Sequence, residues 1–451
     1  MQHLLNRVLS AISAPDRSDA INDCPASVLA LLPADPDPLI ALAHSKLHTF
    51  SFAAVPLCWR RLYTDASIAK AVAWIDYGLA HPDDEKKPPS STKRKRDRDA
   101  VQGSHSGLSG EVWIDEAVQV LDMAIIMAGA AGRQQMIDEL ISGLQSYLKH
   151  NAAPQSKRPR LEKDWDSFPI GRNVGLSKLP MVPSVQYPVQ SATAPSMRAF
   201  EMHMKTAQPL RIKEALDHWP AMHERPWSSP AYLLDMTLGG RRLIPIELGR
   251  SYTDADWGQS IITFKDFMHR YMMPDAADPS KLGYLAQHDL FAQIPSLRND
   301  IAIPDYCYTV PPPLKSPDST TAGLAPSPQL DEPLLNAWFG PAGTVSPLHT
   351  DPYHNILCQV VGKKYIRLYS PDQTNNLYPK GVEDGGVDMS NTSEVDAEAS
   401  LDELEADFPL FRQAEYVETI LAEGECLYIP VGWWHYVRSL SVSFSVSFWW
   451  N

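Results

Sequence analysis

Apolar residues recur at spacings of three and four through most of residues 1–150, and this periodicity predicts α-helices. The pattern is interrupted at 82–110 by a polar, charged and proline-bearing run. That run has too little apolar surface to form a core, so we expect a disordered loop there. The helices on its two sides should pack together as one helical N-terminal domain, residues 1–150. The predicted helical segments are 26–32, 38–47, 66–80, 112–132 and 134–150.

A basic and proline-rich stretch at 151–198 is predicted to be a linker that is partly draped on the next domain. From residue 199 the pattern changes to short apolar runs between turn residues, which favours β-strands. Two polar inserts, 311–332 and 383–407, are predicted to be exposed surface loops. Segments 241–248 and 283–291 delimit a region of shorter candidate strands and helices. The clearest strand signals are 334–340, 355–362, 363–370, 424–430, 434–440 and 441–450.

The run SVSFSVSFWW at 441–450 has the cleanest period of two in the chain. Alternation places Phe444, Val446 and Phe448 on one face of a strand and the intervening serines on the other. Many short strands separated by turns are typical of a barrel or a sandwich. With the helical region in front, the chain is predicted to be of the α+β class, with residues 199–451 forming its β-rich domain.

The charge of the chain limits the kinds of partner it is expected to bind, and its cysteines indicate the kind of cellular compartment. Lys and Arg number 40 against 54 Asp and Glu, a net charge of −14, which argues against direct nucleic-acid binding and favours basic protein segments as partners. The five cysteines have no CxxC spacing, as expected in a reducing compartment. No apolar run approaches ~18 residues, so no membrane span is expected. The basic runs 93–96 and 157–160 are similar to nuclear-import signals, which predicts a nuclear protein and leaves the cytoplasm open.

One constellation indicates metal chemistry. His349 and Asp351 form an HxD pair after a turn-rich segment, and His435 lies in a second turn–strand frame, IPVGWWH. Two imidazoles and one carboxylate are the facial triad that suits non-haem Fe(II), and three protein ligands leave open positions for a 2-oxo acid and O2. An HxD pair alone is a weak signal, because it also occurs in surface turns. His354 is a competing ligand, although its spacing from Asp351 fits no familiar arrangement.

A 2-oxo acid with a distal carboxylate needs a buried cation, because an unpaired anion is costly to remove from water. Lys364 is the candidate, since it lies in the strand that follows the HxD turn. The alternative for Lys364 is an ordinary lysine on the solvent face of that strand. Tyr284, Ser346 and Asn355 are candidates for the hydroxyl and amide donors that would complete the pocket.

Long segments resemble the Jumonji-C oxygenases, above all the subgroup of Jumonji-C-domain protein five, also called lysine demethylase eight. The resemblance rests on NAWFGPAGTVSPLHTDPYHNILCQVVGKKYIRLYSP, GECLYIPVGWWHYVRSL and SVSFSVSFWW. It extends through GRSYTDADWGQ, GYLAQHDLFAQIPSLRNDIAIPDYC and NTSEVD, and so covers roughly 200–451. The departures are Thr350 between the ligands, the pair Tyr353-His354 and the long insert 311–332. These departures affect the expected substrate and leave the metal site intact.

The resemblance implies a Jumonji-C catalytic domain at 199–451 with a double-stranded β-helix, the jelly-roll fold of cupins. It implies that His349, Asp351 and His435 hold Fe(II), which acts with 2-oxoglutarate and O2 as cosubstrates. It further implies that Lys364 binds the distal carboxylate of 2-oxoglutarate with help from Tyr284, Ser346 and Asn355. Members of the subgroup are described as arginyl hydroxylases acting at C3. The residues that resemble the arginine pocket are Glu247, Trp338 and Trp449.

Three functions therefore compete. The first is protein hydroxylation at an arginine, for which Glu247 and two tryptophan planes would form the pocket. The second is removal of N-methyl groups from histone lysine, which uses the same cosubstrates. The third is a non-catalytic role in which the helical domain recruits a chromatin or other partner whose identity the sequence does not show. The intact triad favours the first two over the third.

Overall fold

The computed structural model of the chain describes residues 1–32, 34–51, 54–81, 111–151, 167–168, 182–253, 257–273, 282–312, 327–383 and 386–451. It divides the chain into two compact units. The helical unit comprises 1–162, 237–245 and 261–266. The second unit comprises 163–236, 246–260 and 267–451, and we call it the catalytic unit because it contains most of the domain that the sequence predicts to be catalytic. The two units are therefore interleaved along the sequence, unlike the two contiguous domains, 1–150 and 199–451, that the sequence predicts.

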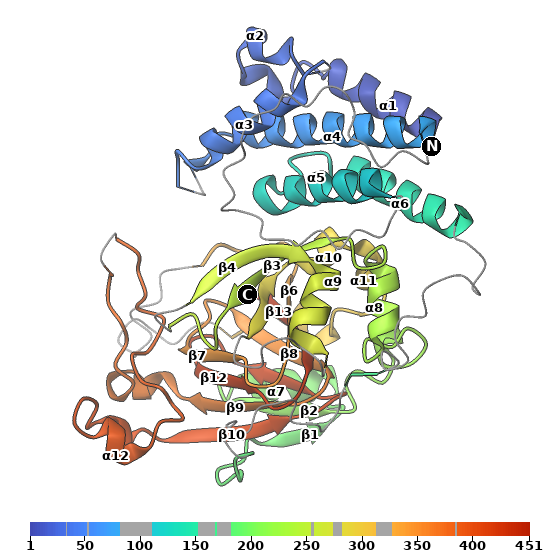
Figure 1. Cartoon of the computed structure of the whole chain (residues 1–451). Helices are drawn as coiled ribbons and strands as arrows, with labels where there is room; N and C mark the ends of the chain where they lie inside the picture. Colours follow the sequence, from blue (N-terminus) through green and yellow to red (C-terminus); the bar gives the residue numbers. More distant parts are fainter. Residues whose placement is uncertain are drawn as a thin grey trace. The chain divides into compact units, whose positions relative to one another are not determined.

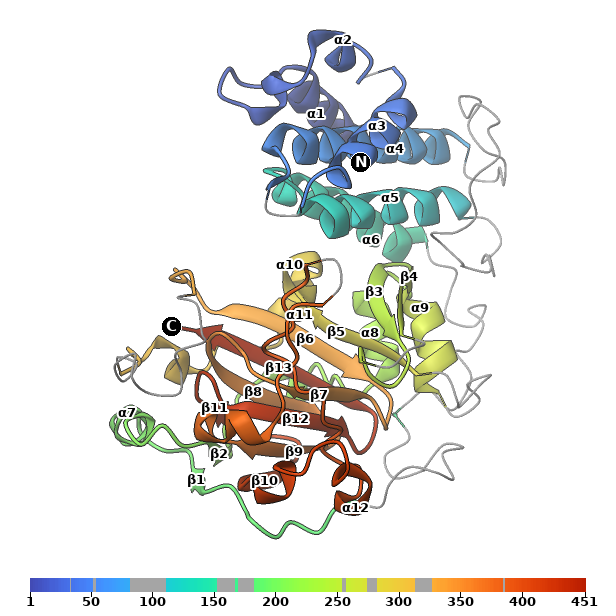
Figure 2. The same ribbon diagram turned by 90° about the vertical axis from the view of Figure 1, so that its left-hand side faces the viewer.

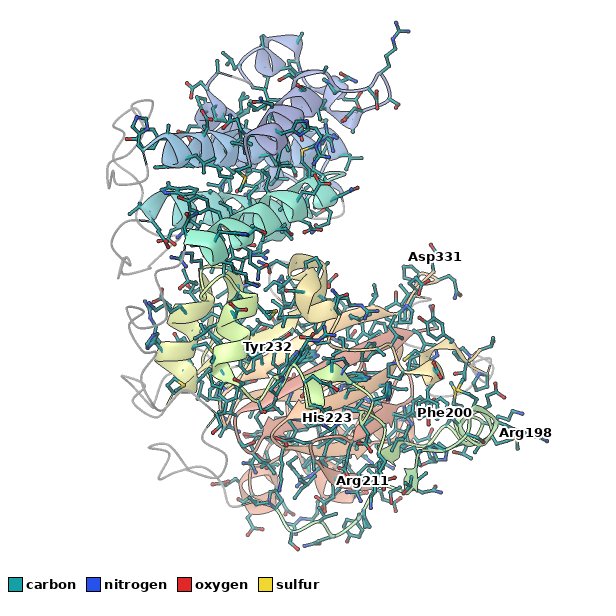
Figure 3. The ribbon with its side chains drawn as sticks, turned by 90° about the vertical axis from the view of Figure 1, so that its right-hand side faces the viewer. Arg198, Phe200, Arg211, His223, Tyr232 and Asp331 are labelled. Carbon is teal, nitrogen blue, oxygen red and sulfur yellow. The ribbon has the colours of Figure 1, made fainter. Side chains whose placement is uncertain are left out.

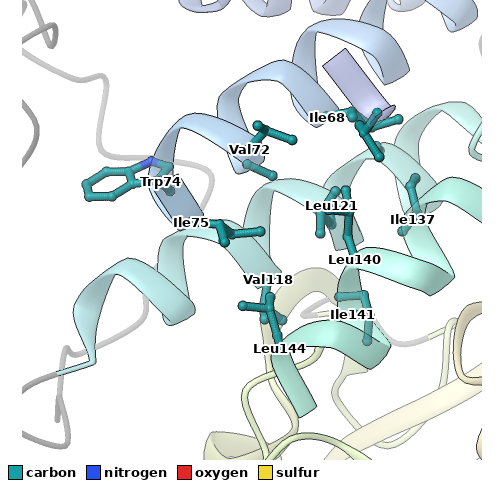
Figure 4. Packing of buried hydrophobic residues seen from close by; sticks show 14 of the residues in the cluster. Ile68, Val72, Trp74, Ile75, Val118, Leu121, Ile137, Leu140, Ile141 and Leu144 are labelled. Carbon is teal, nitrogen blue, oxygen red and sulfur yellow. The ribbon is translucent and has the colours of Figure 1, made fainter. Parts of the chain in front are cut away.

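The helical unit is formed by six helices, drawn in blue to blue-green in Figure 1. Apolar side chains at three- and four-residue spacing along α4, α5 and α6 interlock in its centre. Figure 4 shows Ile68, Val72 and Ile75 of α4 facing residues of α5 and α6 such as Leu121 and Leu140. The helices are α1 (Gln2–Ser13), α2 (Ala26–Leu29), α3 (Pro36–Leu47), α4 (Leu57–Ala80), α5 (Val112–Ala128) and α6 (Gln134–Asn151).

Residues 237–245 complete this unit. Leu238 is 4 % exposed and belongs to the same apolar cluster as α4, α5 and α6. Arg242 and Asp122, which are also buried, form an ion pair in which Arg242 Nη2 lies 2.6 Å from Asp122 Oδ1. The second carboxylate oxygen of Asp122 accepts the backbone N–H of Leu243 at 2.7 Å. Asp122 thus holds the 237–245 segment by one charge pair and one backbone hydrogen bond.

The strands, most of which belong to the catalytic unit, form the two layers of a jelly-roll (Figures 1 and 2). The larger sheet has nine strands in the order β1-β2-β11-β8-β13-β6-β5-β3-β4, and the smaller has four in the order β10-β9-β12-β7. This architecture, with the helical region before it, confirms the predicted fold class. The strands are β1 (Ser191–Thr193), β2 (Leu210–Lys213), β3 (Leu243–Leu248), β4 (Gly258–Thr263), β5 (Gly283–His288), β6 (Leu334–Gly340), β7 (Val345–His349), β8 (His354–Val361), β9 (Lys364–Tyr369), β10 (Tyr416–Leu421), β11 (Cys426–Ile429), β12 (Trp434–Ser439) and β13 (Ser443–Trp450).

Short helices flank these sheets. They are α7 (Met197–Met204), α8 (Pro230–Met236), α9 (Phe264–Phe267), α10 (Leu290–Gln293), α11 (Pro295–Arg298), α12 (Leu401–Leu404) and the 3-10 helix η6 (Asp305–Tyr308). Figure 3 labels Phe200 on α7 and Tyr232 on α8. No helix among the residues described above combines the length and apolarity that crossing a membrane requires.

Strand β13 is central in the larger sheet and both of its faces are buried. Its apolar face packs on aromatic rings, such as Phe444 on Phe339 with centroids 4.5 Å apart. Its serine face is satisfied by hydrogen bonds: Ser445 Oγ donates to Gln359 Oε1 at 2.8 Å, and Ser447 Oγ accepts from Trp338 Nε1 at 2.9 Å. Serine alternation here therefore marks a hydrogen-bonded interior face instead of a solvent face.

Most of the described residues of the insert 383–407 are exposed, as the sequence analysis expects, but a short part of the insert is buried. Thr392, Ser393 and Val395 are buried, and Ser393 N donates to the Leu348 carbonyl at 2.8 Å. The segment pairs with the end of β7. There it forms hydrogen bonds with backbone N–H and C=O groups that would otherwise bond to water. Polar composition concealed this, because the interactions are mainly backbone hydrogen bonds.

The structure describes the other predicted linkers and loops only in part. The predicted linker 151–198 contributes β1 to the larger sheet at 191–193, and Val189 N donates to the Glu418 carbonyl at 3.0 Å. The insert 311–332 is described only at 311–312 and 327–332. The predicted loop 82–110 and both basic runs, 93–96 and 157–160, lie outside the described residues.

The Asp122–Arg242 pair generates a stability prediction. Asp122→Ala should lower the free energy of unfolding of the helical unit by about 3–5 kcal/mol, because it leaves a buried guanidinium without its carboxylate. Asp122→Leu combined with Arg242→Met should recover most of that loss. The measurement is hydrogen exchange of the α5 amides under denaturant.

The matched control is Glu139→Gln, which removes the partner of Arg7 in an ion pair whose arginine side chain is 57 % exposed. That change should cost at most about 1 kcal/mol, because exposed pairs contribute little. An Asp122→Ala chain no less stable than this control would show that the buried pair does not hold 237–245 in place.

Candidate metal centre and its cavity

A cavity of ≈ 270 Å³ opens beside β7 in the catalytic unit. Backbone and side chains from β3, β5, β6, β7 and β13 form its walls. Six of the ten candidate site residues named from the sequence line it: Glu247, Ser346, Trp338, Trp449, His349 and Asp351. The remaining lining residues are Tyr252, Ala286, Gln287, Val345, Thr350, Pro352 and Asn391.

His349, Asp351 and His435 form one cluster whose potential ligand atoms all lie within 4.8 Å of one another. Asp351 Oδ1 is 3.8 Å from His349 Nε2, and Asp351 Oδ2 is 3.5 Å from His435 Nε2. The Nδ1 atoms of the two histidines are 2.7 Å and 3.0 Å from the carbonyl oxygens of Pro347 and Trp433. Those carbonyls accept from a protonated Nδ1, which leaves the Nε2 lone pairs directed at the carboxylate. This donor set suits a divalent cation such as Fe(II).

Strand pairing explains why these residues meet. His349 ends β7, and the antiparallel register of β7 with β12 places His435 directly opposite it. Gly432 turns the chain between β11 and β12 with a φ of +77°, a conformation that favours glycine. Asn355, the second residue of β8, donates its amide to Asp351 Oδ2 at 3.1 Å and fixes the carboxylate. Sheet register thus brings together the HxD pair and the distant histidine, which are far apart in the sequence.

Burial controls the protonation of the cluster. Burial, with a smaller contribution from the neighbouring His435, lowers the pKa of His349 to about 4, so His349 is neutral at physiological pH. For Asp351, burial raises the pKa, but the two histidines and Asn355 outweigh it and the pKa falls below its ordinary value. For His435, burial lowers the pKa and the Asp351 charge more than offsets this, so the pKa is raised. The cluster therefore offers an anionic carboxylate and imidazole nitrogens to a cation.

A second polar group lies next to the cavity, at the start of β9. Lys364 is 1 % exposed, and its Nζ donates to Tyr284 Oη at 3.2 Å. Burial lowers the pKa of Lys364 to about 7. Among the described residues no carboxylate lies within ion-pair distance of its amine. Since Asn355 Oδ1 is also buried without a hydrogen-bond partner, polar groups remain here for a ligand with an anionic end.

The turn before Lys364 is specific. Gly362 has a φ of +75°, and a Cβ at this position would lie 1.9 Å from the Val442 carbonyl oxygen. Only glycine fits this close approach, so the β8–β9 hairpin is fixed and Lys364 begins β9 with its side chain inside. The solvent-facing alternative for Lys364 is wrong. Ser346 lines the cavity and hydrogen-bonds Tyr284.

The candidate substrate residues meet at the mouth of the cavity. Glu247 lies opposite Tyr284 in the β3–β5 pairing, and burial raises the pKa of its carboxyl group despite a hydrogen bond from Trp257. Trp338 and Trp449 add two indole rings. The Trp449 N–H is buried and has no hydrogen-bond partner among the described residues. One carboxylate, two aromatic planes and an unused donor thus line one chamber.

Among the lining residues that had no role assigned from the sequence, Gln287, Tyr252 and Asn391 have notable positions. Gln287 has a φ of +46°, unusual for a non-glycine residue, at an irregularity in the β5–β6 pairing that turns Ala286 and Gln287 toward the cavity. Tyr252 and Asn391 come from GRSYTDADWGQ and NTSEVD, and Asn391 hydrogen-bonds Thr350 through its backbone and side chain. Both segments are part of the family resemblance, so Tyr252 and Asn391 could have been identified as candidate site residues from the sequence.

His354 does not join the metal cluster. Its Nδ1 lies 3.0 Å from Tyr428 Oη, and its ring stacks on Tyr428 at an interplanar angle of 9°. Burial lowers the pKa of His354 to about 4. Alternation along β8 explains the difference, because adjacent residues of a strand point to opposite faces and Asn355 takes the face of the cluster.

Comparison with known proteins agrees with this geometry. The family model described as "Cupin-like domain" matches residues 196–451. The chain is 41 % identical to "Lysine-specific demethylase 8" of Danio rerio over 345 residues, 75 % of each chain. It is 43 % identical to "Jumonji C domain-containing protein 5" of Drosophila melanogaster, covering 57 % of this chain and 58 % of that one. A more distant relative, 27 % identical over 54 % of this chain and 77 % of its own, is the human "Bifunctional peptidase and (3S)-lysyl hydroxylase JMJD7".

The cluster predicts one divalent metal per chain. His435→Ala should reduce bound Fe(II), measured by anaerobic dialysis and elemental analysis, from about one ion per chain to a small fraction, because two ligands hold it poorly. His354→Gln is the matched control, since His354 is a buried histidine nearby that makes no contact with the cluster. Equal metal content in the His435→Ala and wild-type chains would rule out this cluster as the metal site.

Proposed function

Because the chain belongs to the cupin-like domain family, in its Jumonji-C oxygenase branch, we propose that it hydroxylates an arginine side chain of a protein at C3. The enzyme class itself follows from the family: this is a 2-oxoglutarate-dependent dioxygenase that uses Fe(II), 2-oxoglutarate and O2. The observation that carries the arginine proposal is the buried carboxylate of Glu247 in a chamber with two tryptophan rings.

His349, Asp351 and His435 would hold the iron, and their geometry and donor types fit it. With its cosubstrates bound, the iron supplies the oxidation of a C–H bond, while 2-oxoglutarate is converted to succinate and CO2. The protein residues keep the ligands in place: two backbone carbonyls set the histidine tautomers, and Asn355 orients the Asp351 carboxylate. Burial of the cluster limits access of water to the reacting site.

Lys364 would pair with the distal carboxylate of 2-oxoglutarate. Its buried amine has one hydroxyl partner, Tyr284, and an anion would supply the missing counter-charge. Ser346 lines the cavity, and Asn355 Oδ1 is buried without a hydrogen-bond partner among the described residues, so both offer polar atoms. This arrangement supports the predicted cosubstrate site, with the carboxylate end at Lys364 and the oxo-acid end toward the triad.

A guanidinium fits the chamber better than a methylated ammonium. Arginine presents five N–H donors in a plane, which need acceptors and favour stacking on aromatic faces. Glu247 provides the anionic acceptor, and Trp338 and Trp449 provide the faces. A trimethylated ammonium has no N–H donor, so it could not donate a hydrogen bond to the Glu247 carboxylate.

Demethylation of N-methyl-lysine is the second candidate. It is favoured by the printed names of relatives, such as "Lysine-specific demethylase 8", and by the two tryptophans. Such names also support a protein substrate and a nuclear location for this chain. The third possibility, a purely non-catalytic partner-binding role, is disfavoured by the complete ligand cluster.

Cosubstrate binding should depend on pH through Lys364. With its pKa lowered to about 7, the amine is charged below pH 7 and increasingly neutral above it. Affinity for 2-oxoglutarate, measured without O2, should therefore fall as the pH rises from about 6 to about 9, approaching a tenfold loss per pH unit at the alkaline end.

Lys364→Met is the control for that titration. It should bind 2-oxoglutarate at least about tenfold more weakly at pH 6, because a charge-assisted contact is lost, and its affinity should hardly change with pH. Wild-type affinity that stays constant over this range would remove Lys364 as the group that pairs with the cosubstrate.

The reaction outcome is tested with paired peptides that carry either arginine or N-methyl-lysine at the same position. Mass spectrometry should find the gain of one oxygen atom on the arginine peptide, whereas loss of a methyl group with release of formaldehyde would establish demethylation instead. Glu247→Gln should lower kcat/KM for the arginine peptide roughly ten- to a hundredfold, because it removes the charged acceptor. Glu394→Gln, a change at an exposed carboxylate, should leave kcat/KM unchanged.

A further inference from the structure

A larger groove of ≈ 580 Å³ lies in the catalytic unit beside the C-terminal strand. One wall is the strap, which we define as residues 327–333, and the opposite wall is the segment 307–312, which begins in the last two residues of η6. Its floor includes His354 and Trp450, which are both buried. None of the residues so far assigned to metal or cosubstrate lines this groove.

The strap is anchored by side chains and not by strand pairing. Asn451 accepts the backbone N–H of Leu330 at 3.0 Å and donates its own amide to the Pro328 carbonyl at 3.0 Å. Ser327 Oγ donates to the Pro352 carbonyl at 2.9 Å, and Tyr353 Oη donates to the Pro328 carbonyl at 3.2 Å. These four contacts hold the wall of the groove at a fixed distance from β13 and from the HxD turn.

The groove continues the catalytic cavity. Pro352, the residue directly after the ligand Asp351, lines both spaces. Trp449 lines the cavity and Trp450 lines the groove, so consecutive residues of β13 face the two. The ring of Tyr353, which also lines the groove, lies 6.0 Å from that of Trp449. A polypeptide with one side chain in the cavity can therefore pass into the groove around Pro352.

The charge of the groove is negative. Asp331 and Glu332 on the strap are exposed, and Figure 3 shows Asp331 at the edge of the ribbon. No lysine or arginine is found among the described residues that line the groove. Arg298, which lies near Tyr308 but outside the groove, directs one guanidinium nitrogen to the Ile301 carbonyl at 3.0 Å. Cations of a partner would therefore be attracted to the strap.

The opposite wall is apolar and open to solvent. Tyr308 is 58 % exposed and Val310 is 90 % exposed, and Pro311 and Pro312 continue the wall. Exposed apolar side chains facing a pair of carboxylates suit a chain whose long aliphatic stems end in positive charges, as in lysine and arginine. A partner of that chemistry can contact both walls at once.

We propose that this groove binds a basic stretch of the polypeptide substrate that lies a few residues from the side chain in the catalytic cavity. The inference rests on the proposed function, because it takes the substrate to be a polypeptide. It adds a second determinant of substrate specificity: the enzyme recognises the charge of the residues that flank the oxidised residue, separately from that residue itself. The carboxylates of Asp331 and Glu332 supply that selection.

The test uses two fluorescein-labelled peptides with one arginine between small residues, flanked on both sides either by lysines or by glutamates. Fluorescence anisotropy with the full-length chain should show tighter binding of the lysine-flanked peptide. Asp331→Asn with Glu332→Gln should weaken that binding about three- to tenfold, and added salt should reduce the difference. Both substitutions are at exposed positions and preserve side-chain shape, so the fold is retained.

The control is Asp217→Asn with Glu224→Gln, two exposed carboxylates of the same unit that do not line the groove. It should bind both peptides as the wild type does. Equal affinity of the strap variant and the wild type for the lysine-flanked peptide would overturn the proposal. The proposal would also be overturned if the strap variant bound both peptides as the wild type does but changed self-association of the chain, measured as the concentration dependence of sedimentation. The groove would then bind a second copy of the chain.

Turnover separates this inference from the proposed function. Where the arginine peptides are oxidised, the strap variant should raise KM for the lysine-flanked peptide and leave kcat unchanged, as expected for a contact remote from the reacting atoms. Charge-dependent binding without any oxidation of arginine would refute the arginine hydroxylase proposal and support the groove. Oxidation of both peptides with equal KM and equal affinity would refute the groove and support the hydroxylase.

Discussion

The antiparallel pairing of β7 with β12 is the constraint on which the site depends. It places His435 opposite His349, and each histidine is held by a carbonyl two residues before it in its own chain segment. Side chains alternate along a strand, so a shift of one residue in the pairing register would direct one imidazole to the other face of the sheet. The two histidines and Asp351 would then no longer lie together. The 383–407 segment protects this register, since its backbone pairs with Leu348 at the end of β7.

Buried charges in this protein fall into two kinds, and their partners distinguish them. Arg242 and Asp122 satisfy each other inside the helical unit, so their role is structural. Lys364 is equally buried, yet its described partner is the neutral hydroxyl of Tyr284, and burial lowers its pKa to about 7. A buried amine without a counter-charge is costly unless a ligand supplies one. The same reasoning separates Glu247, whose carboxyl pKa is raised by burial, from the exposed carboxylates of the strap.

Much of this arrangement was accessible from the sequence, and the failures have physical causes. Period-two patterns located β6, β8, β9, β12 and β13, and the HxD pair with its distant histidine identified residues that the structure brings together. Strand β7 was missed because VSPLH carries a proline and little alternation. The strand at 191–193 and the attachment of 392–393 to β7 were not predicted, because they depend on backbone hydrogen bonds that no side-chain pattern records. The inclusion of 237–245 in the helical unit depends on long-range contacts such as Asp122–Arg242. Such contacts cannot be predicted from amino-acid composition.

The chemistry of the metal centre does not by itself choose a substrate, because an oxidising iron reacts with whichever C–H bond is held nearest. Selection must therefore come from the surfaces that position the polypeptide. The chamber around Glu247 can read one side chain, and its volume of ≈ 270 Å³ leaves room for little else. The neighbouring groove is about twice as large, is bounded by a strap fixed through Asn451, and meets the chamber at Pro352. Since Pro352 directly follows Asp351, the turn that carries a proposed metal ligand also forms the junction of the two surfaces. In our proposal, this one turn helps to position both the oxidised side chain and the flanking sequence.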